Sequence, residues 1–275
     1  MTYSEANRQR YAKDSSQASF LEAEWSDYLL GQEIEPMAPI DPLGRKAGPG
    51  FYQTVARLTR DWSNSHDRPP RHYCDVGGST GRAVYELAGC IGSLEELVLA
   101  EPSYNLAQWA RQLLCEPVEL DWIPVLHNAE GVSWARAHDR PENRFPEGKS
   151  LFIYPVDSES VPRPAGYFEL VTCLNVVDRV PDPISLVRSL HRLLAPGGLL
   201  ILSSPLEFDE QFTPDRARWV TDLRDLLDDD AWVTVGDSNV LYDFRLYRRG
   251  WIRYSSQVVG VRKRGTGVQN TGSPR

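Results

Sequence analysis

The chain has 275 residues, of which 41% are hydrophobic, and its formal net charge at pH 7 is −8. This length and apolar content suit one sizeable core, so we expect a single main domain with an N-terminal helical addition. The acidic balance argues against a nucleic-acid-binding protein, and no run approaches the roughly 18 apolar residues that span a bilayer. The sequence shows no N-terminal signal pattern, and we therefore expect a cytoplasmic protein.

Residues 1–68 are predicted to form a helical region. Aromatic and leucine side chains recur at helical spacing from Ser15 to Leu30, and a second helix is expected from Phe51 to Trp62. A connection rich in proline and glycine joins them. The aromatic side chains either pack the helices onto the main domain or, as a group, form a lid over a substrate.

The most informative segment is residues 74–82, Cys-Asp-Val-Gly-Gly-Ser-Thr-Gly-Arg, which predicts a strand, a glycine turn and a following helix. Glycine has no β-carbon, so a ligand can approach the backbone, and the amides that open the helix offer unpaired N–H donors. We expect the turn to cradle a nucleotide-like cofactor, although isolated glycine-rich turns are often ordinary tight turns. The candidate residues here are Asp75, Gly77, Gly78, Thr80 and Gly81.

A second apolar run, from Leu94 to Ala100, ends in Glu101 and Pro102, about 20–25 residues beyond the glycines, where a dinucleotide fold places a ribose-binding acid. A carboxylate at this position can accept hydrogen bonds from both ribose hydroxyls. The acid inside the first strand and the pattern D-x-G-G-x-T-G differ from the G-x-G-x-x-G turn of nicotinamide enzymes.

Three further apolar runs are expected to be strands, at residues 151–158, 167–174 and 199–203. A helix with leucines at 186, 190, 193 and 194 precedes the last run, and Pro196-Gly197-Gly198 is expected to stop it. Strands that alternate with helices imply an α/β fold, a doubly wound and mostly parallel sheet covered on both faces. A ligand then lies beyond the carboxyl ends of the strands, near the switch in strand order.

These segments resemble the class I, seven-β-strand methyltransferases that depend on S-adenosylmethionine (SAM). The resemblance spans roughly residues 70–205 and, more loosely, the C-terminal hairpin. It implies a Rossmann-like SAM-binding domain over residues 69–263, with S-adenosylhomocysteine as the product. In that family the end of the third strand contacts the adenine, so Asp157 and Ser158 are expected to bind the cofactor; for Asp157 the alternative is a turn-capping role.

The segment 175–183, Asn-Val-Val-Asp-Arg-Val-Pro-Asp-Pro, resembles the Asn-x-x-Asp-Arg element of protein-histidine and mercaptohistidine N-methyltransferases, which implies an imidazole nitrogen as acceptor. A neutral imidazole has a free lone pair and needs no strong base, but its tautomer must be fixed. Asp178 can do this from the other ring nitrogen, and Asn175 can orient the ring or the cofactor amino group. The residues expected to act on or contact the acceptor are Asn175, Asp178, Arg179, Tyr242 and Tyr247.

The alternative for Asp178 and Arg179 is an ion pair that caps a helix beside Asp182. Further along, we expect a helix from Thr213 to Leu227 with proline at its first position. Two strands, 232–235 and 254–261, are expected to form an antiparallel hairpin around residues 241–251. Residues 264–275 are expected to be disordered.

Residues 116–150 form a long connection with no obvious element, which suggests a substrate loop. His127 and His138 lie there without the neighbouring ligands of a metal site, and the four cysteines include no C-x-x-C pair, so we expect neither a metal nor a disulfide framework. Arg245, Arg248, Arg249 and Arg253 are expected to form a solvated hairpin face, with acids nearby, rather than a phosphate track.

Together these features predict a SAM-dependent methyltransferase that acts on an imidazole or amine nitrogen of a small molecule or peptide. One alternative is O-methylation of a natural-product hydroxyl, for which the sequence shows no clear general base. Another is a SAM-binding regulatory protein without catalysis. No nucleic-acid or membrane partner is expected, and the oligomeric state does not follow from the sequence.

Overall fold

The computed structural model describes residues 10–31, 50–64, 69–115, 121–127, 131–137, 148–247 and 250–265, with the backbone alone at Tyr247. Its main sheet has seven strands in the order β5-β2-β1-β6-β7-β9-β8. The first five are parallel, and β9 pairs antiparallel with both β7 and β8. This confirms the doubly wound, mostly parallel sheet. The strands are β1 (His72–Val76), β2 (Glu96–Ala100), β5 (Ser150–Tyr154), β6 (Phe168–Leu174), β7 (Leu194–Ser204), β8 (Trp232–Tyr247) and β9 (Gly250–Lys263).

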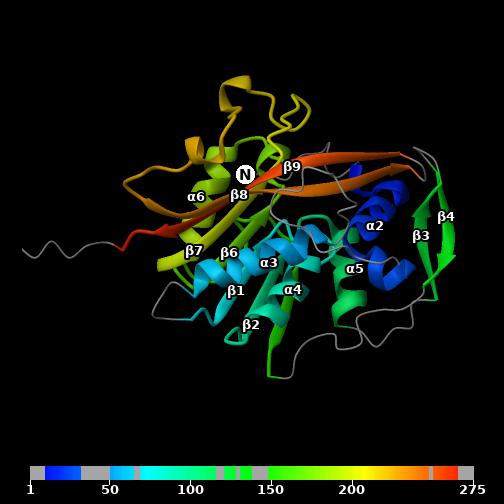
Figure 1. Ribbon diagram of the computed structural model, residues 1–275, viewed down its shortest axis with the longest axis horizontal. Helices are drawn as coiled ribbons and strands as arrows, with labels where there is room; N and C mark the ends of the chain where they lie inside the picture. Colours follow the sequence, from blue (N-terminus) through cyan, green and yellow to red (C-terminus); the bar gives the residue numbers. More distant parts are fainter. Residues whose placement is uncertain are drawn as a thin grey trace, which may run out of the picture.

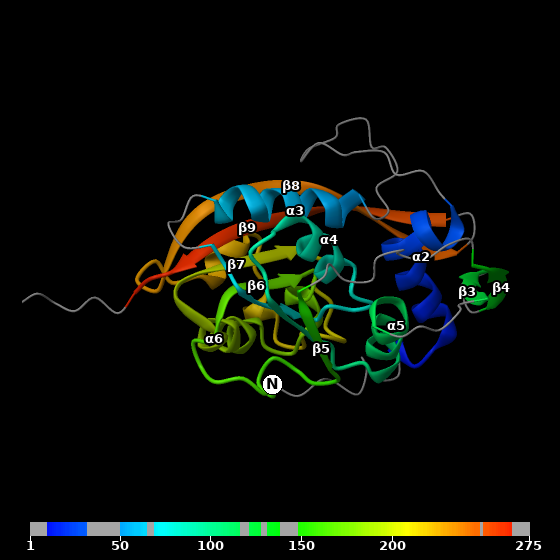
Figure 2. The same ribbon diagram turned by 90° about the horizontal axis from the view of Figure 1, so that it is seen from below.

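Helices cover both faces of the sheet (Figures 1 and 2). On one face lie α3 (Gly50–Ser63) and α4 (Arg82–Cys90), and α5 (Tyr104–Leu114) joins their apolar cluster through Ala110. On the other face lies α6 (Pro183–Leu193). The side chains of a strand alternate between the two faces of the sheet, so each strand contributes residues to two apolar cores. Cys74 and Cys173 point into the core beneath α6, fully buried, where a thiol packs as a small hydrophobe.

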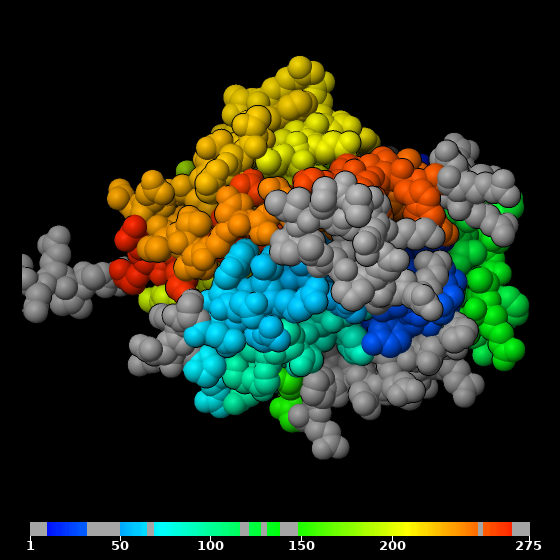
Figure 3. All heavy atoms as spheres, in the orientation of Figure 1, coloured from blue at the N-terminus to red at the C-terminus, as the bar shows by residue number. Residues whose placement is uncertain are grey.

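The predicted N-terminal helices are confirmed, as α2 (Asp14–Leu30) and α3. Gly31 ends α2 in the left-handed conformation that glycine adopts without strain. In the space-filling view, the β8–β9 hairpin runs along α3 and reaches α2 (Figure 3). The indole of Trp62 fills the space over Gly236 and Gly260, where any β-carbon would collide with it, and this fixes α3 on the hairpin.

Residues 116–150 are not without structure. They contain a separate two-stranded antiparallel sheet, β3 (Trp122–Leu126) and β4 (Val132–Arg136). Its inner face places Ile123 in an apolar cluster with Leu21 and Leu29 of α2. The expectation of no element was wrong because each strand is only five residues long. His127 is exposed, and His138 lies outside the described residues.

The prediction of a helix over residues 213–227 was also wrong. Two short 3₁₀ turns occupy this stretch, at Arg216–Arg218 and Leu223–Leu226. The carboxylates of Asp215 and Asp222 accept from backbone N–H groups two residues on, so local turns compete successfully with a helix.

The hairpin is longer than predicted, because residues 236–247 and 250–253 continue its strands. Arg253 pairs with Asp243 of the same hairpin, as expected of an acid-balanced face. Arg245 is not part of a solvated face, because it is largely buried in an ion pair with Glu22 of α2. Arg248 and Arg249 lie outside the described residues. The helix that Pro196-Gly197-Gly198 was expected to stop is α6, which ends at Leu193, and β7 starts directly after it. The tail expected to be disordered lies outside the described residues from 266 onwards. Among the described helices, none is both long and apolar enough to cross a bilayer.

Candidate active site

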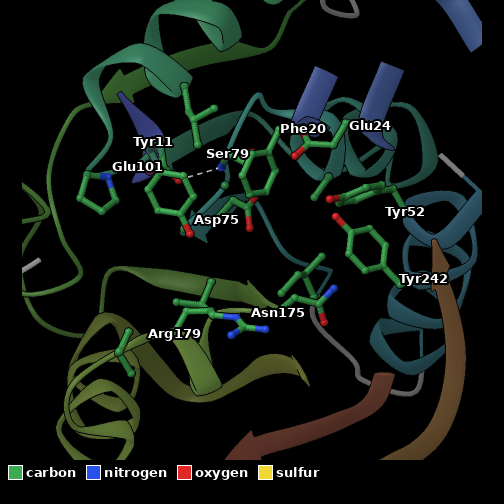
Figure 4. A pocket seen from close by; sticks show the side chains of 18 residues that line it. Tyr11, Phe20, Glu24, Tyr52, Asp75, Ser79, Glu101, Asn175, Arg179 and Tyr242 are labelled. Carbon is green, nitrogen blue, oxygen red and sulfur yellow. Dashed lines mark hydrogen bonds between the residues drawn. The ribbon is translucent and has the colours of Figure 1, made fainter. Parts of the chain in front are cut away.

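A pocket lies at the carboxyl ends of β1, β2 and β6 and is lined by two groups of residues (Figure 4). We call the first group the strand wall, since it follows β1 and β2, and the second the cap wall, since it comes from the N-terminal region and β8. The Asn175–Val180 segment after β6 borders both. The strand wall consists of Asp75, Gly77, Gly78, Ser79, Glu101, Pro102 and Leu106, and the cap wall of Tyr11, Phe20, Glu24, Tyr52 and Tyr242.

The glycines form the tight turn that the sequence predicted, but not all of them are required to make room for a ligand. Gly77 has φ +72°, and a β-carbon there would lie 2.5 Å from the Val176 side chain. Gly81 has φ +91°, and its β-carbon would lie 2.6 Å from Leu114. Gly77 and Gly78 line the pocket, but Gly81 does not: it is glycine because of its backbone angle and the close packing of α5.

Glu101 is held by the backbone around it. Its carboxylate accepts hydrogen bonds from the N–H of Ser79 at 2.9 Å and of Ser103 at 2.8 Å, and the residue is 5% exposed. Burial raises the pKa of Glu101 to about 7. The predicted acid at the end of the second strand therefore faces the pocket beside the glycine turn.

Asp75 offers an unpaired oxygen. Its Oδ1 accepts from the Thr172 hydroxyl at 2.6 Å, and Thr172 is in turn 2.6 Å from the Tyr73 hydroxyl. The buried Oδ2 has no hydrogen-bond partner among the described residues. Burial raises the pKa of Asp75 to about 7, and the charge of nearby Glu24 contributes to this rise. A ligand with an N–H group would satisfy this oxygen.

Sequence reasoning missed Glu24, which projects from α2 into the pocket. One carboxylate oxygen accepts a hydrogen bond from the Thr80 hydroxyl, and the other, Oε1, has no hydrogen-bond partner among the described residues. Glu24 is fully buried, and burial raises its pKa to about 7. Thr80, predicted to touch the cofactor, does not line the pocket; it holds Glu24, and it accepts from the Trp25 indole at 2.9 Å.

A buried arginine anchors α2 above the start of α4. Arg82 donates to the carboxylate of Asp27 through two nitrogens, each at 2.7 Å, and to the backbone oxygen of Glu24 at 2.7 Å. Its guanidinium also lies 5.0 Å from the ring of Trp25. This anchor fixes the position of Glu24 over the glycine turn.

Aromatic rings complete the cap wall. Tyr52 and Tyr242 meet edge to face with ring centroids 6.3 Å apart. Phe20 packs against Phe244 of β8 at 5.3 Å. Tyr242 lines the pocket, whereas the side chain of Tyr247 lies outside the described residues.

The segment after β6 turns sharply, which separates its polar side chains. Asn175 lines the pocket with φ +56°, a strained angle of the kind found at functional sites, and its side-chain oxygen accepts from Ser203 at 3.0 Å. The 3₁₀ turn Val177–Arg179 then directs Arg179 to the pocket.

Asp178, by contrast, points away from the pocket. It is fully buried, accepts from Ser204 at 3.0 Å and lies 3.5 Å from the Arg179 guanidinium. The acceptor contact expected for Asp178 is therefore not present in this geometry, because its side chain faces β7. The ion-pair alternative fits better, although Asp182, not Asp178, caps the following helix.

Asp157 and Ser158 are likewise not among the pocket-lining residues. The carboxylate of Asp157 accepts from the N–H of Glu159 and of Ser160, both at 3.1 Å. This is the turn-capping alternative considered for Asp157.

Comparison with known proteins agrees with the fold. A family model described as a methyltransferase domain matches residues 33–251, and the chain therefore belongs to this family. Ubiquinone biosynthesis O-methyltransferases are similar over shorter stretches: that of Psychrobacter arcticus is 30% identical over 112 residues, 34% of this chain and 44% of the relative. That of Pseudomonas paraeruginosa is 51% identical over 39 residues, 14% and 17% of the two chains. The chain thus spans less than half the length of these curated relatives.

Two solved structures share the fold at low sequence identity. N-methyltransferase NodS from Bradyrhizobium japonicum has a TM-score of 0.51 and 12% identity, covering 80% of this chain and all of NodS. A SAM-dependent methyltransferase from Leishmania major has a TM-score of 0.51 and 13% identity, covering 94% and 87%. The chain therefore carries a methyltransferase domain with the class I fold, the fold of methyltransferases that use SAM.

The pocket residues fit this cofactor. SAM carries a ribose, a sulfonium and a primary ammonium group. The pocket offers an acid at the ribose position, Glu101, and two unpaired buried carboxylate oxygens, on Asp75 and Glu24. Groups that hold positive charge and donate N–H bonds satisfy such oxygens.

Proposed function

We propose that this enzyme transfers the methyl group of SAM to a nitrogen atom, an amine or an imidazole, of a small molecule or peptide. The observation that carries the proposal is the charge of the pocket. Three buried carboxyl groups line it, on Glu24, Asp75 and Glu101, and Arg179 is the one cationic side chain among the lining residues that the structure describes.

An acidic pocket favours a nitrogen acceptor over an oxygen acceptor. Transfer to a neutral nitrogen moves positive charge from sulfur to nitrogen, so a cation faces the carboxylates throughout the reaction. Transfer to a phenolate requires an anion to form beside those carboxylates, and their charge raises the acceptor's pKa. Preorganised carboxylates therefore stabilise the first reaction and oppose the second.

The cap wall supports the same acceptor. The rings of Tyr11, Phe20, Tyr52 and Tyr242 line the pocket, and aromatic faces attract cationic nitrogen with about 0.5–2 kcal/mol. An amine that becomes more positive in the transition state gains from such rings, whereas a hydroxyl that becomes a neutral ether does not.

In this proposal the chain's own residues mainly bind and orient. Glu101 accepts from the ribose hydroxyls, Pro102 and Leu106 pack against the adenine, and Gly77 and Gly78 leave room for the sulfur-bearing chain. Asn175 orients the acceptor. Bound SAM supplies the electrophilic methyl group, and correct positioning of the acceptor can remove about 7–11 kcal/mol of the barrier.

O-methylation remains a second candidate, favoured by the similarity to ubiquinone biosynthesis O-methyltransferases. An oxygen acceptor needs a base, and the carboxyl groups of raised pKa are the candidates in the pocket. A catechol would be the first oxygen acceptor to test.

The test is a transfer assay with methyl-labelled SAM and three acceptor types: a primary amine, an imidazole such as histidine or mercaptohistidine, and a catechol. SAM binding is measured separately by calorimetry, so that an unsuitable acceptor is distinguished from a protein without cofactor. Label in the amine or imidazole supports the proposal. Label in the catechol alone contradicts it and supports the second candidate.

A further inference from the structure

Two buried carboxylate oxygens in the pocket lack a partner, and they belong to residues from opposite walls. Glu24 is 0% exposed and Asp75 is 1% exposed, yet Glu24 Oε1 and Asp75 Oδ2 have no hydrogen-bond partner among the described residues. Both residues line the pocket, and Figure 4 shows both carboxyl groups directed into it. An unsatisfied buried carboxylate oxygen is costly, so a pair of them indicates a missing donor.

The two carboxyl groups are close enough to sense each other. The charge of Glu24 raises the pKa of Asp75, beyond the larger effect of burial. Neighbouring carboxylates that cannot both ionise freely either share a proton or bind a cation. The chemistry of this pair therefore selects a ligand with positive charge and several N–H donors, which is a primary ammonium group.

Glu24 is also held rigidly, as a binding residue must be. Thr80 donates to its second oxygen, and the anchor of α2 through Arg82 and Asp27 fixes the helix from which it projects. A site that is already ordered loses little conformational entropy when its ligand binds.

The glycine turn sets the spacing between this pair and the ribose site. The N–H of Ser79 holds Glu101, and the hydroxyl of the next residue, Thr80, holds Glu24. A ligand whose ribose binds Glu101 and whose ammonium group binds Glu24 therefore extends along the short glycine turn that holds both carboxylates. An adenosyl amino acid has this arrangement of groups.

We propose that Glu24 and Asp75 form a two-carboxylate site for the ammonium group of the cofactor's amino-acid part, so that α2 belongs to the cofactor site and not only to an acceptor lid. The inference depends on SAM as cofactor and is independent of whether nitrogen or oxygen accepts the methyl group.

The experiment compares two ligands that differ in the amino-acid part. S-adenosylhomocysteine carries the ammonium group, whereas 5′-methylthioadenosine has the same adenosyl thioether without it. Calorimetry measures both affinities for the native protein and for Glu24→Gln, which keeps the shape of the side chain and an oxygen for Thr80. We expect the substitution to weaken S-adenosylhomocysteine about tenfold or more and to leave methylthioadenosine unchanged.

Glu22→Gln is the matched control, because Glu22 is also a buried carboxylate of α2 but is paired with Arg245 and does not line the pocket. It should leave the ratio of the two affinities unchanged. The ratio does not depend on how much of a variant is folded. Equal weakening of both ligands by Glu24→Gln, or no weakening of either, overturns the inference. Failure of the native protein to bind SAM or S-adenosylhomocysteine would instead overturn the cofactor assignment.

Discussion

The guanidinium of Arg82 and the carboxylate of Asp27 form a two-point ion pair, with both distances 2.7 Å, at a place where Arg82 is completely buried. Arg82 is also paired with Glu86 at 2.7 Å, so Asp27→Asn removes one of the two carboxylates that compensate the buried guanidinium. We therefore expect Asp27→Asn to lower the free energy of unfolding by about 2–3 kcal/mol, measured by urea denaturation. Asp61→Asn, which removes an exposed pair with Arg60, should have little effect on the free energy of unfolding. Equal effects of the two substitutions would show that Arg82 does not anchor α2.

The acid groups of the pocket predict an unusual dependence of stability on pH. Burial raises the pKa of Glu24, Asp75 and Glu101 to about 7, from 4.5 or 3.8. Between these values the folded state binds more protons than the unfolded state, so the free energy of unfolding falls as the pH rises. For the unliganded protein we expect a lower melting temperature at pH 8 than at pH 5.5. In Glu24→Gln this fall should be smaller, and a fall of unchanged size would contradict the assignment.

The same groups make cofactor binding depend on pH in the opposite direction. A cationic ligand needs ionised carboxylates, which predominate above pH 7. The affinity for SAM should therefore decrease as the pH is lowered from 8 to 6, with protons released on binding. Calorimetry in two buffers of different protonation enthalpy counts these protons. An affinity that does not change over this range would exclude ionisation of the cluster on binding.

Position 77 requires glycine for two reasons, its positive φ angle and the close approach of the Val176 side chain. Gly77→Ala places a side chain at φ +72° and 2.5 Å from Val176, and we expect a loss of about 1–3 kcal/mol from the angle alone. Adding Val176→Ala should relieve the contact but not the angle, so the double variant should be less unstable than the sum of the single variants. Gly89→Ala is the control, since its β-carbon meets nothing within 4 Å and should stabilise α4 by about 0.5–1 kcal/mol. Strict additivity at positions 77 and 176 would argue against the contact.

Arg179 and Asp178 are adjacent, but the structure gives them different roles. Arg179 lines the pocket, so Arg179→Met, which removes the positive charge there, should lower kcat/KM about tenfold or more. Asp178 faces Ser204, so Asp178→Asn should leave KM for the acceptor and the affinity for SAM unchanged. Steady-state kinetics with the best acceptor tests both. The reverse order of effects would restore Asp178 as the residue that orients the acceptor.

The parts of the site that follow strands could be predicted from the sequence. An acid at the end of a parallel strand, such as Glu101, lies at the carboxyl edge of the sheet whatever the exact strand register. Two glycines of the turn after β1 mark backbone positions that line the pocket. Asp75 and Asn175 were placed for the same reason. Local pattern and sheet topology together determine these positions.

The remaining residues could not be placed because their positions depend on contacts between distant segments. Glu24 is one polar residue in an α-helix. Two contacts with distant residues make it a pocket residue: its bond to Thr80, 56 positions away, and the anchor of α2 on Arg82. The direction of Asp178 depends on a single 3₁₀ turn, which the sequence does not specify. A sequence signal for Glu24 existed only in its place among aromatic residues of a predicted helix.

The position of β9 has a consequence for synthesis of the protein. β9 lies between β7 and β8, although it is the last strand in the part of the chain that the structure describes. The edge of β7 therefore stays unpaired until residues 250–263 have left the ribosome. Tyr242 joins the pocket only when that hairpin closes. A nascent chain therefore carries an exposed sheet edge and an incomplete cofactor site, which makes it prone to aggregation. SAM stabilises the protein only after the hairpin has closed. A higher concentration of SAM therefore stabilises the folded protein but does not help the chain to fold during translation.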